Sequence, residues 1–152
     1  MERINLSRLI LGGIVAGIVG DVLAFLVDGV MLGPQWAASM KALGRPDFTS
    51  TQWIAFNLMG IVSGIFAVWL YAAIRPRFGA GPKTAVLAGL AVWFIGILLP
   101  NVGFMGVAGL FPTDLTLMTT TAGIVEWAIA ALAGCALYKE AEGSARSMAA
   151  RA

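Results

Sequence analysis

The sequence contains no histidine and only one cysteine, and both shortages narrow the chemistry open to it. Histidine is the commonest general base, the usual zinc ligand and the commonest axial ligand of haem, so sites built on histidine are excluded. The single cysteine, Cys135, cannot form an internal disulfide or a multi-cysteine metal site. It lies among alanines and a glycine, where we expect a small packing residue.

Charged residues are also scarce. They make up 12% of the 152 residues, whereas 59% are hydrophobic, a composition far from that of a soluble domain. A membrane-spanning helix needs about 20 mostly apolar residues. Four such stretches occur, at 8–32, 52–74, 83–101 and 115–138. They predict an all-α bundle of four transmembrane helices in a lipid bilayer, forming a single domain over residues 1–152.

The basic residues fall unequally on the two sides of these predicted helices. Lys41 and Arg45 lie on one side, and eight lie on the other: Arg3, Arg8, Arg75, Arg77, Lys83, Lys139, Arg146 and Arg151. By the positive-inside rule both termini and the middle loop are expected in the cytoplasm. Arg75, Arg77 and Lys83 are candidates for binding anionic lipid head groups. No basic and aromatic face is present, so we expect no nucleic-acid partner.

The segment between the first two helices predicts a short amphipathic helix at the outer interface. In "GPQWAASMKALG", Pro34 suits a helix start, and Trp36, Met40 and Leu43 recur at helical spacing. The following "TSTQ", Thr49 to Gln52, matches a capping box for the second membrane helix.

Two further connections contain proline. In "RPRFGAGPK", Pro76 disfavours helix at Arg75, and the glycines permit a tight reversal. The outer connection between Pro100 and Pro112 reads as an oily loop that packs on the bundle, re-enters the interface or meets a partner. Asn101 is expected to cap the end of the third helix.

Three predicted helices place small and polar residues on one face. Small residues at this spacing let membrane helices approach closely. The faces comprise Gly13, Gly17, Asp21, Ala24 and Asp28; Asn57, Gly60, Gly64, Ala67 and Tyr71; and Thr119, Gly123, Glu126, Ala130 and Ala133. By residue count Asp21 and Glu126 lie near mid-membrane, and Asp28 and Asn57 lie nearer the outside. The sequence therefore predicts a polar interior layer.

The carboxylates of that layer have no lysine or arginine within the spans to neutralise them. A carboxylate at the bilayer centre costs about 3 kcal/mol on insertion scales. A protonated, neutral carboxyl group avoids that cost and can donate a hydrogen bond to a carbonyl, to Ser63 or to another carboxylate. Two interpretations stay open: hydrogen bonds that join helices, and a pathway for protons, cations or a polar solute.

Enzymatic function is not expected. No Ser, Cys or Lys nucleophile has a recognisable base, and no phosphate-binding loop or metal-ligand spacing is present. Two carboxylates at similar depth are a weak sign of acid and base catalysis. No cofactor is predicted.

The stretch at 68–100, "VWLYAAIRPRFGAGPKTAVLAGLAVWFIGILLP", with "VMLGPQWAASMKALGR" before it and "ALYKE" after the fourth helix, resembles a group of small bacterial four-span membrane proteins of unknown function. The resemblance covers nearly the whole chain. It implies a multi-pass protein of the bacterial inner membrane and assigns no functional residue.

Three functions follow from these observations. The first is a non-catalytic membrane protein that packs against other subunits or copies of itself, which the glycine faces and the oily outer loop favour. The second is a transporter or channel in which Asp28 and Asn57 form an outer entrance to a central site at Asp21 and Glu126. The third is a binder of lipid, quinone or pigment that uses Trp93, Trp127 and glycine-lined grooves.

Overall fold

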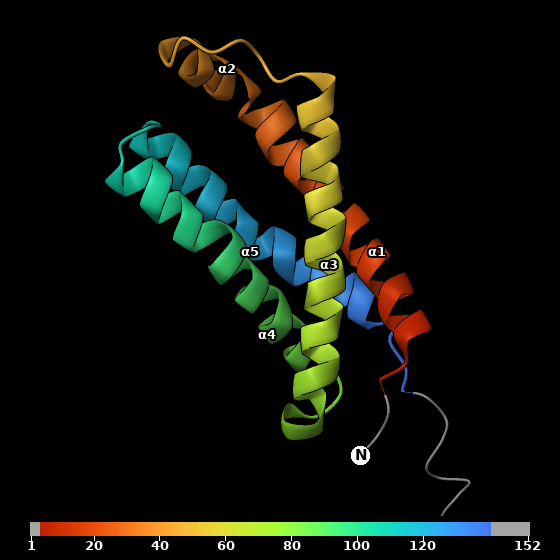
Figure 1. Cartoon of the computed structure of the whole chain (residues 1–152). Helices are drawn as coiled ribbons and strands as arrows, with labels where there is room; N and C mark the ends of the chain where they lie inside the picture. Colours follow the sequence, from red (N-terminus) through yellow and green to blue (C-terminus); the bar gives the residue numbers. More distant parts are fainter. Residues whose placement is uncertain (1–3, 141–152) are drawn as a thin grey trace, which may run out of the picture.

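The computed structural model describes residues 4–140, and its regular structure in that range is helical (Figure 1). Two of the long helices continue as π-helical segments, in which the backbone hydrogen bonds span one more residue than in an α-helix. In chain order the elements are α1 (Leu6–Ala24), η1 (Phe25–Met31), α2 (Gly33–Ala42), α3 (Ser50–Phe78), α4 (Pro82–Trp93), η2 (Phe94–Leu98), η3 (Asn101–Val107) and α5 (Thr113–Cys135).

Within residues 4–140, four helical stretches are long and apolar enough to cross a membrane. They are Leu6–Met31, Ser50–Phe78, Pro82–Val107 and Thr113–Cys135. The predicted all-α fold with four spans is therefore confirmed, and the chain has the character of a multi-pass membrane protein. The expected amphipathic segment forms α2. Arg3, Arg146 and Arg151, which entered the orientation argument, lie outside the described residues.

The start of α3 follows from its capping box, as predicted. The Thr49 side chain accepts a hydrogen bond from the backbone N–H of Gln52 at 3.4 Å. Gln52 Oε1 in return accepts one from the backbone N–H of Thr49 at 2.8 Å. These two bonds satisfy donors that have no partner inside the helix.

The end of α3 corrects one prediction. The helix does not stop before Pro76 but runs through it to Phe78. Pro76 has no N–H to donate to the carbonyl of Ala72, which costs the helix one backbone bond. Only Arg77 and Phe78 follow Pro76 in α3, so the interruption is confined to its last turn. The reversal comes at Gly79 and Gly81, whose φ angles of 83° and 139° suit glycine.

The connection after the third predicted helix corrects a second prediction. Residues 101–107 were expected to form a loop, but the helix continues through Pro100 as η3. Pro100 has helical dihedral angles, with φ of −61° and ψ of −43°. The adjoining π-helical turns give a physical reason, because they are one way in which membrane helices accommodate proline.

The four spans pack unequally at the two ends of the molecule. α1 packs against α3 and α5, and α4 packs against α5 and α3. The α4–α5 hairpin leans away from α1 and α3 towards the end that carries α2 (Figure 1). We call that end the far end. The opposite end, where α1 begins and α5 stops, we call the terminal end.

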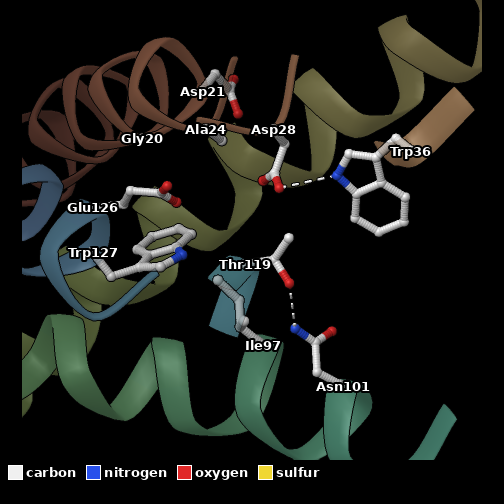
Figure 2. A pocket seen from close by; sticks show the side chains of 10 residues that line it. All are labelled: Gly20, Asp21, Ala24, Asp28, Trp36, Ile97, Asn101, Thr119, Glu126 and Trp127. Atoms are coloured by element: carbon white, nitrogen blue, oxygen red, sulfur yellow. Dashed lines mark hydrogen bonds between the residues drawn. The ribbon is translucent and has the colours of Figure 1, made fainter. Parts of the chain in front are cut away.

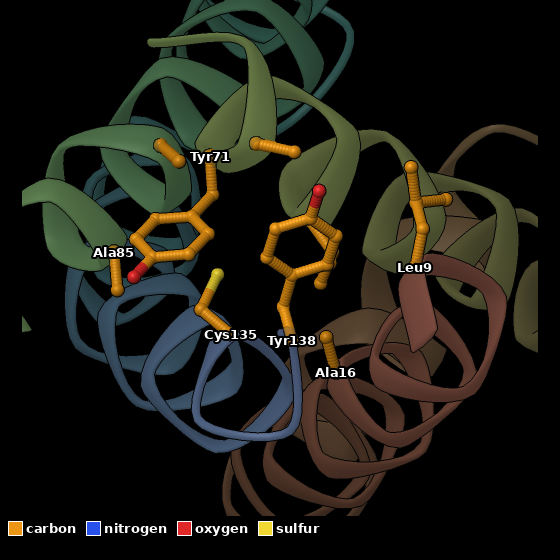
Figure 3. Close-up of a cluster of buried hydrophobic side chains, with 9 residues drawn as sticks. Leu9, Ala16, Tyr71, Ala85, Cys135 and Tyr138 are labelled. Carbon is orange, nitrogen blue, oxygen red and sulfur yellow. The ribbon is translucent and has the colours of Figure 1, made fainter. Parts of the chain in front are cut away.

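The terminal end contains the main cluster of buried side chains (Figure 3). Tyr71 and Tyr138 meet there edge to face, with ring centroids 6.0 Å apart. Cys135 is buried beside them. The other members are small or aliphatic: Leu9, Ala16, Val68, Ala72, Ala85 and Ala88. The spans are thus closely packed at the terminal end.

Candidate carboxylate site

A cavity of about 220 Å³ lies between the α1–η1 span and the α4–α5 hairpin. Three carboxylates line it, those of Asp21, Asp28 and Glu126. Figure 2 shows Asp21 and Asp28 on one wall and Glu126, from α5, on another. The remaining lining residues are Gly20, Ala24, Trp36, Ile97, Asn101, Thr119 and Trp127. We call this space the carboxylate cavity; no lysine or arginine in the described part of the chain lines it.

Glu126 is the most deeply buried of the three acids. The residue is 7% exposed, and within residues 4–140 its Oε1 atom has no hydrogen-bond partner. A buried polar atom without a partner costs about 1–3 kcal/mol, and more when it is charged. Glu126 therefore supplies an unsatisfied acceptor in the wall of the carboxylate cavity.

Asp28 has a hydrogen-bond partner that the sequence pattern did not predict. The indole Nε1 of Trp36 donates a hydrogen bond to Asp28 Oδ1 at 3.1 Å (Figure 2). The Trp36 ring also meets Phe111 edge to face, with centroids 5.2 Å apart. Trp36 thus connects η1 to the α4–α5 hairpin at the far end. The turn after η1 carries α2 back over the cavity, and helical spacing alone did not predict that reversal.

The wall opposite Asp28 contains a second polar group. Asn101 Nδ2 donates to the hydroxyl of Thr120 at 2.8 Å and lies 3.5 Å from that of Thr119. The indole Nε1 of Trp93 donates to the backbone carbonyl of Thr120 at 2.8 Å. Asn101 therefore joins η3 to α5 and does not cap a helix end, which corrects its predicted role. It is free to make this bond because the helix continues past it.

Two predicted site residues lie away from the carboxylate cavity. Asn57 is exposed on α3, where its Nδ2 donates to the backbone carbonyl of Trp53 at 2.7 Å. It lines a different space, which Asp28 and Asp21 also line, so the predicted entrance between Asp28 and Asn57 stays a prediction. Ser63 lines neither space.

That different space is a groove of about 940 Å³ between the second half of α1, η1, α2 and the first half of α3. Its wall includes Phe48, Trp53 and Phe56, whose rings contact one another edge to face. We call it the lateral groove. Asp21, Ala24, Asp28 and Trp36 line both the lateral groove and the carboxylate cavity.

The predicted packing glycines lie at contacts between helices of this chain. A Cβ added at Gly13 or Gly17 would meet the α3 backbone at Ile65 or Ile61. One at Gly64 would meet the α1 backbone at Gly13 and Gly17.

The other two predicted glycines touch side chains of the site. A Cβ added at Gly60 would collide with the Asp21 carboxylate, so this glycine makes room for the acid. One at Gly123 would lie 2.9 Å from Cδ1 of Ile97, which lines the cavity, and 3.0 Å from the Trp93 ring.

The three predicted lipid-binding residues have two different environments. Arg75 forms an ion pair with Glu140, with Nη1 and Oε1 3.5 Å apart, and its guanidinium lies 5.8 Å from the centre of the Tyr138 ring. Arg77 and Lys83 are exposed on either side of the turn between α3 and α4.

Burial and the neighbouring Glu140 raise the pKa of Tyr138, which lies just beyond the last span.

The carboxylate cavity lacks the arrangement of a metal centre. Within residues 4–140 no three His, Cys, Asp or Glu side chains lie close enough together to hold a metal ion. The acids are instead distributed around a space far larger than the roughly 10–15 Å³ that one water molecule requires. Such an arrangement suits a cation that carries several hydrogen-bond donors. No known protein family, curated protein or solved structure matches the chain.

Proposed function

We propose that this chain is a multi-pass protein of the bacterial inner membrane that binds a small organic cation in the carboxylate cavity and transports it. The observation that carries the proposal is the buried Oε1 atom of Glu126, which has no protein partner within the described residues. A cation with N–H groups would supply that partner.

The charge of the site supports the same conclusion. Asp21, Asp28 and Glu126 line one space with no basic residue among its described walls. Carboxylates at bilayer depth are costly unless they are paired or neutralised. A bound cation would offset this cost, and the indole rings of Trp36 and Trp127 can add cation–π attraction.

The unequal packing of the two ends supports movement of the ligand in addition to binding. On the terminal side of the cavity, α1 and α3 are in close backbone contact at Gly13, Gly17 and Gly64. The carboxylate cavity lies towards α2, beyond those contacts. We assign the far end to the outside of the cell, in agreement with the positive-inside rule. Release inwards then requires a second state in which the helices separate at the terminal end.

The test is guanidinium uptake into liposomes that contain the purified protein. Guanidinium stays charged at neutral pH, so it does not leak across lipid as a neutral base, and its planar donors match carboxylates. A hydrogen bond to a charged group contributes about 1.5–3 kcal/mol, so Glu126→Gln should lower uptake about tenfold or more.

Asp114→Asn is the matched control, because Asp114 is an exposed acid at the start of the same helix. It should leave uptake unchanged. The proposal fails if wild-type liposomes take up no more guanidinium than protein-free ones. Equal uptake by Glu126→Gln and wild type would also refute it.

A second candidate is association with a partner subunit or with a second copy of the chain. One observation favours it: η3 presents exposed Phe104 and Val107 beside Gly103, where an added Cβ would meet nothing within 4 Å. Native mass spectrometry of the protein extracted in a mild amphiphile tests this candidate, which requires stoichiometric complexes and is abandoned if the chain emerges alone.

A further inference from the structure

The lateral groove indicates which kind of cation the carboxylate cavity takes. It borders the cavity at the Asp21 and Asp28 carboxylates and extends along η1 and α3 to the aromatic rings of Phe48, Trp53 and Phe56. Between these ends its wall is mainly apolar, formed by residues such as Ile18, Val22, Phe25 and Ile61. The groove is thus acidic where it meets the cavity and apolar along its length.

The groove faces the side of the bundle. Residues 50–59, the first ten of α3, are all exposed, so this part of the helix stands away from the other spans. In a membrane protein such a surface meets acyl chains, apart from its outermost residues. A molecule dissolved in the bilayer can therefore reach the groove without passing through water.

The charges at the groove select among such molecules. Its ionisable lining residues are all acids, Asp21, Asp28 and Asp47. A fatty acid or an anionic lipid head group would be repelled by them. A cationic group would be attracted, and its apolar tail would match the rest of the groove.

We propose that the ligand is an amphiphilic organic cation that enters from the bilayer through the lateral groove, with its charged group at Asp21 and Asp28 and its apolar tail along η1 and α3. This inference rests on the proposed function, because it specifies the ligand of the carboxylate cavity. Trp36 lines both spaces and donates a hydrogen bond to Asp28, so an arriving N–H donor competes with its indole for that carboxylate.

The experiment compares guanidinium, n-hexylguanidinium and n-hexanol in binding to the protein in lipid nanodiscs, with empty nanodiscs subtracted. Hexylguanidinium should bind at least tenfold more tightly than guanidinium, because its tail occupies the groove. Hexanol has the same tail without the charge, and it should bind at least tenfold more weakly than hexylguanidinium.

A pair of variants in α2 localises the tail. Ala37 lines the lateral groove and is exposed, so Ala37→Trp should fill the groove and reduce hexylguanidinium affinity to that of guanidinium. The neighbouring Ala38 is also exposed but does not line the groove. Ala38→Trp should therefore retain the preference for the longer ligand.

The possible failures separate the two proposals. If the wild-type protein neither binds nor takes up guanidinium, the proposed function is wrong. If guanidinium binds but the hexyl tail adds no affinity, or Ala37→Trp and Ala38→Trp behave alike, the lateral route is wrong and the cavity stands. If hexanol binds as well as hexylguanidinium, the groove holds a neutral amphiphile and the charge argument is refuted.

Discussion

Replacing Gly64 by alanine tests the close contact between α1 and α3 at the middle of α3. The added methyl group would meet the backbone N and O atoms of Gly17 and Gly13, respectively, and would lie 2.8 Å from the Cα of Gly17. All of these atoms belong to the α1 backbone. They cannot move aside by a change of rotamer, so α1 and α3 must separate.

Two opposing effects set the size of the change. Alanine has a higher helix propensity than glycine by about 1 kcal/mol. Forcing an extra carbon into a well-packed contact costs about 1–3 kcal/mol, and contact with backbone belongs at the upper end of that range. Gly64→Ala should therefore lower the free energy of unfolding by about 2 kcal/mol.

Gly103→Ala is the matched control. Gly103 lies in η3, and a Cβ there would meet nothing within 4 Å. The packing penalty is absent, so this variant should be at least as stable as the wild type. Reversible unfolding in mixed micelles of mild detergent and dodecyl sulfate, followed by circular dichroism, measures both variants. Wild-type stability in Gly64→Ala, or an equal loss in Gly103→Ala, would refute the assignment of a close helix contact to Gly64.

Two further predictions concern the ends of helices. In Tyr71→Phe, which leaves Tyr138 as the only tyrosine, ultraviolet titration should give a tyrosine pKa above the ordinary value of about 10, and adding Glu140→Gln should lower it. The raised pKa means that the folded state holds the Tyr138 proton more tightly than the unfolded state does. The resulting stabilisation is present below pH about 10 and is lost as the pH rises through the folded-state pKa. A titration midpoint at the ordinary tyrosine pKa would contradict this prediction. Thr49→Ala should lower the free energy of unfolding by about 1 kcal/mol, because it removes the side-chain cap of α3. Thr49→Ser keeps a hydroxyl at this position and should not lower it. An equal loss of stability in both variants would contradict the capping argument.

The features predictable from the sequence are those that depend on neighbouring residues. The four spans follow from uninterrupted apolar stretches, and the start of α3 follows from Thr49 and Gln52 three residues apart. The carboxylates of Asp21 and Asp28 share a cavity because their spacing of seven residues keeps them near one face, even though the helix changes to η1 between them.

The features missed depend on contacts between distant residues. Trp36 reaches Asp28 because the chain reverses after η1, and Asn101 reaches Thr120 because the helix passes Pro100. Local rules assign proline to helix ends, but a membrane helix that loses a backbone bond gains little by unfolding, since lipid offers the freed groups no partner. The same rules therefore placed the ends of the second and third spans too early.

The difference between the two ends also has an electrical consequence. In the proposed orientation, water that fills the carboxylate cavity would bring the outer potential close to Asp21 and Glu126, and the voltage would then fall mainly across the packed terminal end. A unit charge that crosses the full membrane potential gains or loses about 2.3 kcal/mol per 100 mV. A cation released from the cavity towards the terminal end would be driven by most of that energy, although it would traverse only part of the bilayer.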